Sequence, residues 1–281
     1  MQRVETCPSC SSAITGEHCA NCGERRPSAR IYTLREFAHE AFETVTSVER
    51  SFLRTFRALL RKPGELTAAY MRGERIRYLK PLQLFLLVNV MFFFAAGPGI
   101  NVFSTSLHNH LRGSPYRAQA QRVVAERLPR SGLTEDQYAV TFNRHTRVLA
   151  RTMVIAMVPA FALGLALLTI RRRRPAVHHL VFSLHFLAIT MLLTATVSWL
   201  LWSGLPIWRA IGWPRTDPQL DQTAGLLMAM GCSAYLLSAF RRAYGLGRGG
   251  AALLAIVGFA LLVAILVGYR MLLFHVTAYT L

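Results

Sequence analysis

The sequence predicts an all-α membrane protein with about five transmembrane helices, preceded by a small N-terminal zinc ribbon and juxtamembrane amphipathic helices. The chain has 281 residues, of which 53% are hydrophobic and only 16% charged, and its mean hydropathy is +0.32. Near its start, two CxxC pairs are separated by eight residues. We therefore expect three regions: a zinc ribbon at 1–30, cytoplasmic interfacial helices at 31–80, and a transmembrane helical domain at 81–281.

The cysteine spacing is typical of a metal site. Each CxxC turn presents two thiolates, and two such turns complete a closed tetrahedral S4 site that leaves no position for substrate. Residues 1–30 contain few apolar side chains, so a metal would have to supply the folding free energy. We predict a structural zinc site, with iron in the same geometry or a pair of disulfides as the alternatives. The predicted ligands are Cys7, Cys10, Cys19 and Cys22.

A nucleic-acid partner is disfavoured for the ribbon. Four arginines against three glutamates give residues 1–30 a net charge of only +1, and the segment has no aromatic ring. His18 lies beside Cys19, but four cysteines already complete a ligand set, so we interpret it as a bystander. Contact with a cytoplasmic protein of unknown identity is the better hypothesis for the ribbon.

Apolar segments long enough to cross a bilayer, which takes about 20 residues, define the membrane domain. The first is the shortest and could be a tilted span or a re-entrant hairpin; we favour a span. The expected spans are 82–97, 152–170, 180–202, 223–240 and 250–269. The loop at 98–150 is expected to be helical over Pro115–Leu128 and Thr134–Arg151, with a cap at Thr134. Small side chains at every fourth position in three spans predict close helix packing within the chain or in a homo-oligomer.

Basic residues at the membrane boundaries predict the orientation. An N-terminus in the cytoplasm places eleven basic residues inside and seven outside, which agrees with the positive-inside rule. The cysteines also require a reducing compartment to remain thiols. Both arguments place the ribbon in the cytoplasm and, with five spans, the C-terminus outside. The inside set is Arg72, Arg75, Arg77, Lys80, Arg171, Arg172, Arg173, Arg174, Arg241, Arg242 and Arg248.

Short helices are expected between the ribbon and the membrane. Thr33 and Glu36 fit a capping box, and a second helix is expected from about Ser47 until Pro63 and Gly64 break it; Gly73 ends the next. A basic interfacial helix and an ordinary surface helix packed on the spans both fit the second helix. Its apolar residues Val48, Phe52, Phe56, Leu59 and Leu60 recur at helical spacing, with Arg50, Arg54, Arg57 and Arg61 on the other side.

The stretch from Tyr70 to Pro81 reads YMRGERIRYLKP. Together with the paired CxxC and the RKPG at residues 61–64, it resembles the bacterial membrane family called domain of unknown function 3667. The resemblance covers residues 7–97 and implies a bacterial inner-membrane protein with several spans, but no catalytic residue. Ser11 departs from the glycine expected after the first CxxC, whereas Gly23 follows the second as expected.

The basic residues of this junction suggest contact with the lipid bilayer. Arg72, Arg75, Arg77 and Lys80 can reach anionic headgroups, and Pro81 can open the first span. Simple anchoring is the leading interpretation, and a dedicated anionic-lipid pocket is the alternative.

No catalytic motif is present, and the spans contain no Asp or Glu, which ion-coupled transporters and proton relays use. His185 is an intramembrane ionisable residue that we interpret as a neutral packing histidine. We predict a non-enzymatic binding, recruitment or regulatory role at the membrane surface. The alternative is a passive channel or a carrier for a small or lipidic substrate, which requires a polar cavity between spans. An intramembrane enzyme would need other polar side chains to converge on His185.

Overall fold

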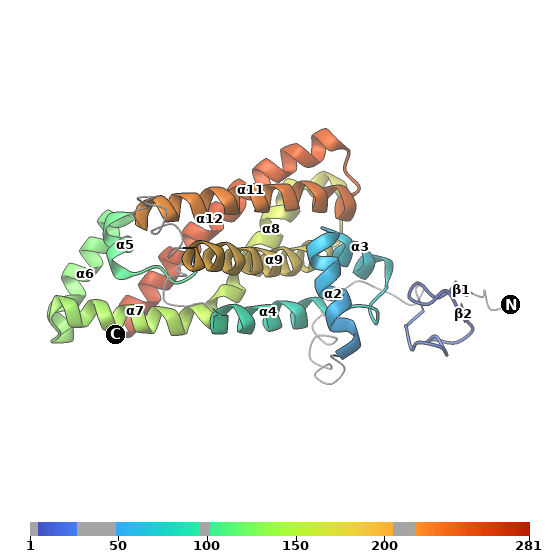
Figure 1. Ribbon diagram of the computed structural model, residues 1–281, viewed down its shortest axis with the longest axis horizontal. Helices are drawn as coiled ribbons and strands as arrows, with labels where there is room; N and C mark the ends of the chain where they lie inside the picture. Colours follow the sequence, from blue (N-terminus) through green and yellow to red (C-terminus); the bar gives the residue numbers. More distant parts are fainter. Residues whose placement is uncertain (1–4, 27–48, 96–101, 205–216) are drawn as a thin grey trace. The chain divides into compact units, whose positions relative to one another are not determined.

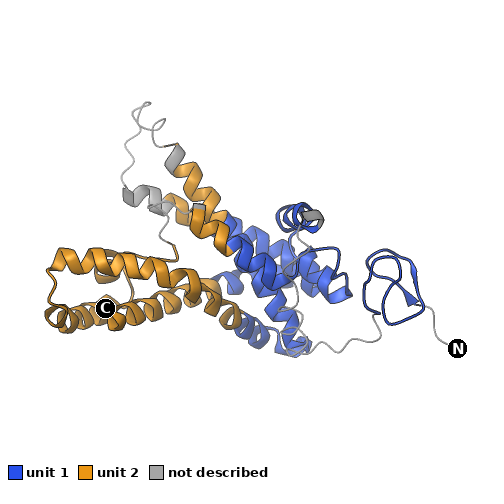
Figure 2. Cartoon of the chain, turned by 90° about the horizontal axis from the view of Figure 1, so that it is seen from below, with its two compact units in different colours: residues 1–88, 162–192, 229–259 blue, residues 89–161, 193–228, 260–281 orange. Residues whose placement is uncertain are grey.

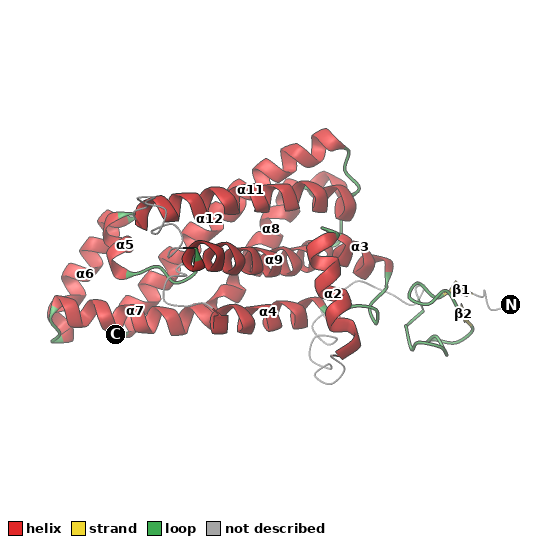
Figure 3. Ribbon diagram, in the orientation of Figure 1, coloured by secondary structure: helices red, strands yellow, loops and turns green. Residues whose placement is uncertain are grey.

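The computed structural model describes residues 5–26, 49–95, 102–204 and 217–281. These residues are almost entirely helical outside the N-terminal ribbon, which confirms the predicted fold class (Figure 3). The capping box predicted at Thr33 and Glu36 lies outside the described residues.

Two compact units divide the chain (Figure 2). Unit 1 contains residues 1–88, 162–192 and 229–259, and unit 2 contains residues 89–161, 193–228 and 260–281. The ribbon and the juxtamembrane helices belong to unit 1, and the helices of the long loop belong to unit 2.

The ribbon contains a short antiparallel pair of strands, β1 (Glu5–Thr6) and β2 (Ala13–Ile14). The next described helices are α2 (Glu49–Arg61) and α3 (Glu65–Arg72), within the region where juxtamembrane helices were predicted (Figure 1). Gly64 and Gly73 flank α3, both with a positive φ, as expected for residues that break and cap helices.

Four stretches of the described residues are long and apolar enough to cross a membrane, at the places where the last four spans were predicted. Helix α4 (Pro81–Ala95), at the first predicted span, is shorter. Its 15 residues extend about 22 Å, less than the ~30 Å hydrocarbon core. A membrane crossing by α4, which would bring the number of spans to five, therefore stays a prediction. The long apolar stretches are Glu135–Leu168, Ala176–Leu201, Thr223–Tyr244 and Arg248–Thr280.

The first long stretch combines three elements. Helix α7 (Glu135–Met153) starts at a capping box between Thr134 and Gln137 and continues through a 3-10 turn, Val154–Ala156, into α8 (Met157–Leu168). Pro159 lacks the N–H that would bond to the carbonyl four residues earlier, which explains why the helix tightens at this turn. The expected loop helix therefore runs directly into the second predicted span.

In unit 1, α9 (Ala176–Ser203) is the most deeply buried helix, and every residue from 181 to 190 is buried. It packs against α11 (Asp217–Tyr244), where the rings of Phe182 and Phe240 stack with their centroids 5.0 Å apart. Phe240 also covers Gly258 of α12 (Arg248–Thr280), where an added Cβ would meet the ring at 3.3 Å. An aromatic cluster thus joins these helices in unit 1.

Unit 2 has its own core, formed by α5 (Leu107–Arg112), α6 (Arg117–Ser131), α7 and the end of α12. Tyr138, Phe142 and Phe274 are buried at its centre. The guanidinium of Arg270 donates two hydrogen bonds, of 2.9 and 2.7 Å, to the carbonyl of Val102. The described part of the long loop predicted at 98–150, from residue 102 on, is therefore a packed helical region.

The small-residue rows predicted to pack helices together are largely open in this structure. Ala260, Ala264 and Gly268 of α12 are exposed, and a Cβ added at Gly268 or at Gly225 would meet no atom within 4 Å. Packing between copies of the chain through these rows stays a prediction.

Gly64 holds the α2–α3 turn against α11 by direct backbone contact, so a side chain at this position should destabilise the protein. Its φ is 78°, and an added Cβ would lie 2.6 Å from the carbonyl oxygen of Ala239. Gly64→Ala should lower the free energy of unfolding by about 3 kcal/mol or more, because strain and overlap combine. Thermal unfolding in detergent, followed by circular dichroism, measures the change.

Gly132→Ala is the matched control. Gly132 has a similar φ of 68°, but a Cβ there would meet no atom within 4 Å. Gly132→Ala should lower the free energy of unfolding by only about 1–2 kcal/mol, because only the strain of the backbone conformation contributes. Equal losses in the two variants would show that close contact with α11 is unimportant.

Candidate metal centre

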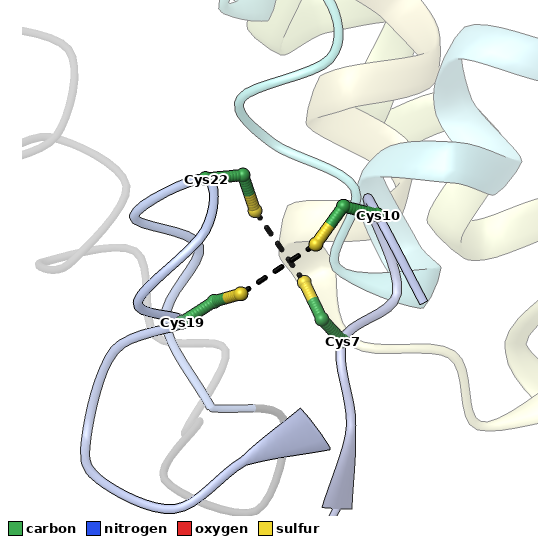
Figure 4. Close-up of side chains that lie close together, drawn as sticks. All are labelled: Cys7, Cys10, Cys19 and Cys22. Carbon is green, nitrogen blue, oxygen red and sulfur yellow. Dashed lines mark hydrogen bonds between the residues drawn. The ribbon is translucent and has the colours of Figure 1, made fainter. Parts of the chain in front are cut away.

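The four predicted cysteines converge on one point (Figure 4). The sulfurs of Cys7 and Cys22 are 3.5 Å apart, as are those of Cys10 and Cys19, and all four lie within 4.8 Å of one another. Tetrahedral zinc at a Zn–S distance of 2.3 Å requires sulfurs about 3.8 Å apart. The sulfurs are therefore close enough to bind one metal ion.

The two CxxC turns have the same hydrogen-bond pattern. The N–H of Ser11 donates to the carbonyl of Cys7 at 2.9 Å, and the N–H of Gly23 donates to that of Cys19 at 2.8 Å. Both Ser11 and Gly23 have a positive φ, of 64° and 75°. Because serine is strained in this conformation, the first turn is formed at a cost that the second avoids. The sequence departure at Ser11 thus changes the turn's energy and leaves its geometry intact.

The local environment shifts the pKa values of two of the thiols in opposite directions. Hydrogen bonds from Ser12 lower the pKa of Cys10 to about 6, which favours the thiolate form that a metal would bind. Burial raises the pKa of Cys22 to about 12, so its proton would be released only when a cation binds. His18 pairs with Arg25 through a β-bridge and is not a member of the cysteine cluster. The donors that a metal would meet in this cluster are all sulfur, which suits zinc or iron.

A buried glutamate follows the second CxxC and joins the ribbon to the rest of unit 1. Glu24 is only 2% exposed, and its Oε2 accepts a hydrogen bond from the hydroxyl of Ser9 at 2.7 Å. The same oxygen accepts the backbone N–H groups of Arg75 and Ile76, at 2.9 and 3.1 Å. Residues 73–80, which we call the strap, are thereby held on the ribbon.

Glu65 and Glu74 pair with two of the basic residues predicted to contact headgroups. Arg72 bonds Glu65 at 2.6 Å and Glu74 at 2.8 Å, and Arg77 bonds Glu74 at 3.3 Å. The guanidinium of Arg75 lies over the ring of Tyr70, 4.7 Å from its centroid. These contacts order the strap from within.

The α2–α3 turn and α3 are in turn fixed to the end of α11. Arg242, at the end of α11, donates to the carbonyl of Pro63 at 2.7 Å and lies 3.7 Å from Glu65. Arg174, before α9, reaches the carbonyl of Tyr244 at 3.5 Å. Three basic turns that are far apart in the sequence therefore meet at one end of unit 1. They are the turn between α2 and α3, the turn before α9, and the turn between α11 and α12.

Two histidines of α9 contact side chains on other elements. Nδ1 of His185 lies 2.9 Å from the hydroxyl of Thr67 in α3, and Nδ1 of His179 lies 2.8 Å from that of Tyr244. Neither ring nitrogen of buried His178 has a hydrogen bond to another described residue. The sequence identified His185 but gave no sign of Thr67, because this contact joins residues 118 positions apart.

These features define a membrane protein with several apolar helices and a four-cysteine head. The head is hydrogen-bonded to a short, charged strap that precedes α4. The family model described as "Protein of unknown function (DUF3667)" matches residues 49–93. The resemblance to this family is thus confirmed over α2, α3, the strap and most of α4. No curated protein and no solved structure matches the chain.

The cluster predicts metal in the purified protein. Wild-type protein in detergent should contain about one zinc per chain by elemental analysis, and a Cys19→Ser, Cys22→Ser variant should contain none. Cys232→Ser is the control, because Cys232 lies in α11, apart from the cluster, and should leave the zinc content unchanged. Disulfides in place of metal in the wild type would contradict both the site and the cytoplasmic position of the ribbon.

Proposed function

We propose that the chain is a membrane-anchored zinc-ribbon protein with a non-enzymatic binding, recruitment or regulatory role at the cytoplasmic surface of a bacterial inner membrane. Zinc is favoured because four thiolates form a closed tetrahedral set, which is typical of structural sites. The site would hold the ribbon folded, since among its described residues only Cys7, Ile14 and Cys19 form a buried apolar cluster.

The contact made by Glu24 is the observation that carries this proposal. A ribbon without contacts to the rest of the chain could recruit a partner protein but could not act on the membrane helices. This ribbon instead binds the backbone of the strap through a buried carboxylate. The strap leads directly into α4, and Leu79 donates its N–H to Thr55 of α2 at 2.9 Å. Metal binding, which folds the ribbon, would therefore change the order of the strap beside the membrane helices. Such coupling is suited to regulation by metal or by a protein that binds the ribbon.

The meeting of the three basic turns supports the proposed orientation. Pro63 contacts Arg242, and Arg174 contacts Tyr244, so the turn before α3 and the segments before α9 and α12 share one end of unit 1. Leu79, two residues before α4, is in turn bonded to Thr55 of α2, the helix that ends at this turn. The chain can return to that end before α9 only if α4 and the α7–α8 stretch carry it away and back. This supports a crossing by α4, five crossings in all, and a C-terminus on the side opposite the ribbon. Under the positive-inside rule, the shared basic end would be cytoplasmic.

The cavity described in unit 1 does not support a carrier or channel. A cavity in unit 1 is lined by Thr67, His185 and Tyr235 together with apolar side chains, and its volume is about 10 Å³. That volume holds about one water molecule, whereas sites for small molecules usually span about 300–1,000 Å³. Binding at the membrane surface therefore remains the function we propose.

Hydrogen–deuterium exchange tests the coupling between ribbon and strap. Glu24→Ala should keep all four cysteines and the metal but remove the side-chain acceptor of the Ile76 N–H, so exchange at this amide should rise at least about tenfold. The N–H of Arg75 keeps its 2.9 Å bond to the carbonyl of Gly73 and should respond less. Chelation of metal from the wild type should produce the same rise. Glu17→Ala, on an exposed ribbon residue, is the control and should change neither. Slow exchange after chelation would mean that the ribbon does not act on the strap.

Reporter fusions test the orientation. Alkaline phosphatase, which folds only outside the cytoplasm, should be active when fused after Leu281 and inactive when fused after Arg174 or Gly247. Green fluorescent protein should give the opposite result. An active phosphatase after Arg174 would reverse the proposed orientation without affecting the metal site.

A further inference from the structure

Helix α2 has two faces with different surroundings. Thr55, Ala58 and Leu59 are buried, and the hydroxyl of Thr55 accepts the N–H of Leu79, two residues before α4 begins. The buried face thus fixes α2 at the level where the chain enters the first apolar helix.

The opposite face of α2 combines apolar and basic side chains. Leu53 is 76% exposed and Leu60 is 57% exposed. The exposed residues Arg54, Arg57 and Arg61 fall on the same side at helical spacing. Two open leucines beside three arginines suit neither water nor a hydrocarbon interior, but they suit the boundary between them, where leucines insert and guanidinium groups reach phosphates.

The direction of α2 agrees with such a position. Within unit 1, Figure 1 shows α2 running across the direction followed by α4 and by the first part of α9. When α9 crosses the bilayer, a helix that runs across it lies parallel to the membrane plane. Its depth is set by the bond between Thr55 and Leu79, at the boundary of the apolar region.

We propose that this face, formed by Leu53, Arg54, Arg57, Leu60 and Arg61, binds anionic phospholipid headgroups in the leaflet next to the ribbon. The surface differs from the junction arginines identified in the sequence, of which Arg72 and Arg77 pair with Glu65 and Glu74. Charge complementarity selects the lipid: three exposed arginines favour an anionic headgroup over a zwitterionic one. The proposal is independent of metal binding by the ribbon.

Photo-crosslinking in nanodiscs tests the position of this face. The full chain would carry p-benzoylphenylalanine in place of Leu53 or Leu60, in discs of phosphatidylcholine with or without phosphatidylglycerol. Mass spectrometry should find lipid adducts at both positions, with phosphatidylglycerol enriched several-fold over its share of the disc. The same label in place of exposed Leu163 of α8 is the positive control, and in place of exposed Thr15 of the ribbon it is the negative control.

Charge variants test the headgroup preference. Arg54→Gln, Arg57→Gln, Arg61→Gln together should remove the enrichment of phosphatidylglycerol, and the corresponding three lysine substitutions should keep it. The control is Arg117→Gln, Arg122→Gln, Arg130→Gln on exposed positions of α6, which should leave the enrichment unchanged. An unchanged melting temperature shows that each variant is folded.

Two results would overturn the proposal. Absence of lipid adducts at Leu53 and Leu60, while Leu163 gives them, would mean that water or a protein covers this face. Adducts without preference for phosphatidylglycerol in the wild type would remove the role assigned to the arginines. Enrichment that is lost in the glutamine variant and kept in the lysine variant supports it.

Discussion

The close contact of Gly64 with the backbone of α11 is the constraint on which the arrangement of unit 1 depends. It brings α3 near enough for Thr67 to reach His185 and for Arg242 to reach both Pro63 and Glu65. The segment that matches the family model is therefore the part that connects the cysteine head to the membrane helices. Pro63, Gly64 and the charged residues of this segment each make a different contact. A segment that only anchored the chain in the membrane would not need these contacts.

The head and the membrane helices use different sources of stability. Within unit 1, α9 and α11 share a buried aromatic cluster, whereas the described part of the ribbon has only a few buried side chains around its cysteines. A metal would therefore contribute most of the free energy that keeps the ribbon folded. Glu24 links these two parts, since the carboxylate that bonds Ser9 within the ribbon also bonds the strap. A metal bound by the cysteines would therefore contribute indirectly to the stability of the strap.

Much of this architecture could be predicted from the sequence, because its signals are local. Cys7, Cys10, Cys19 and Cys22 follow a spacing that is set by the geometry of a single turn, and long apolar runs reveal the later spans. Glu24 could not be identified, since its acceptor role depends on backbone groups some 50 residues away, at positions 75 and 76. The pairing of Arg72 with Glu65 and Glu74 was missed for a related reason: charge counting describes what an arginine could reach, and only the fold decides which partner is nearest.

The bonds from Glu24 have a consequence for how this protein can evolve. The carboxylate binds main-chain N–H groups, so the contact does not specify the side chains of residues 75 and 76. Sequence drift at these two positions can proceed without separating the ribbon from the strap, with one exception. Proline lacks the N–H group and would remove a bond at either position. Relatives that keep this docking should therefore vary in side-chain chemistry here while avoiding proline, a pattern that an observer counting only conserved residues would overlook.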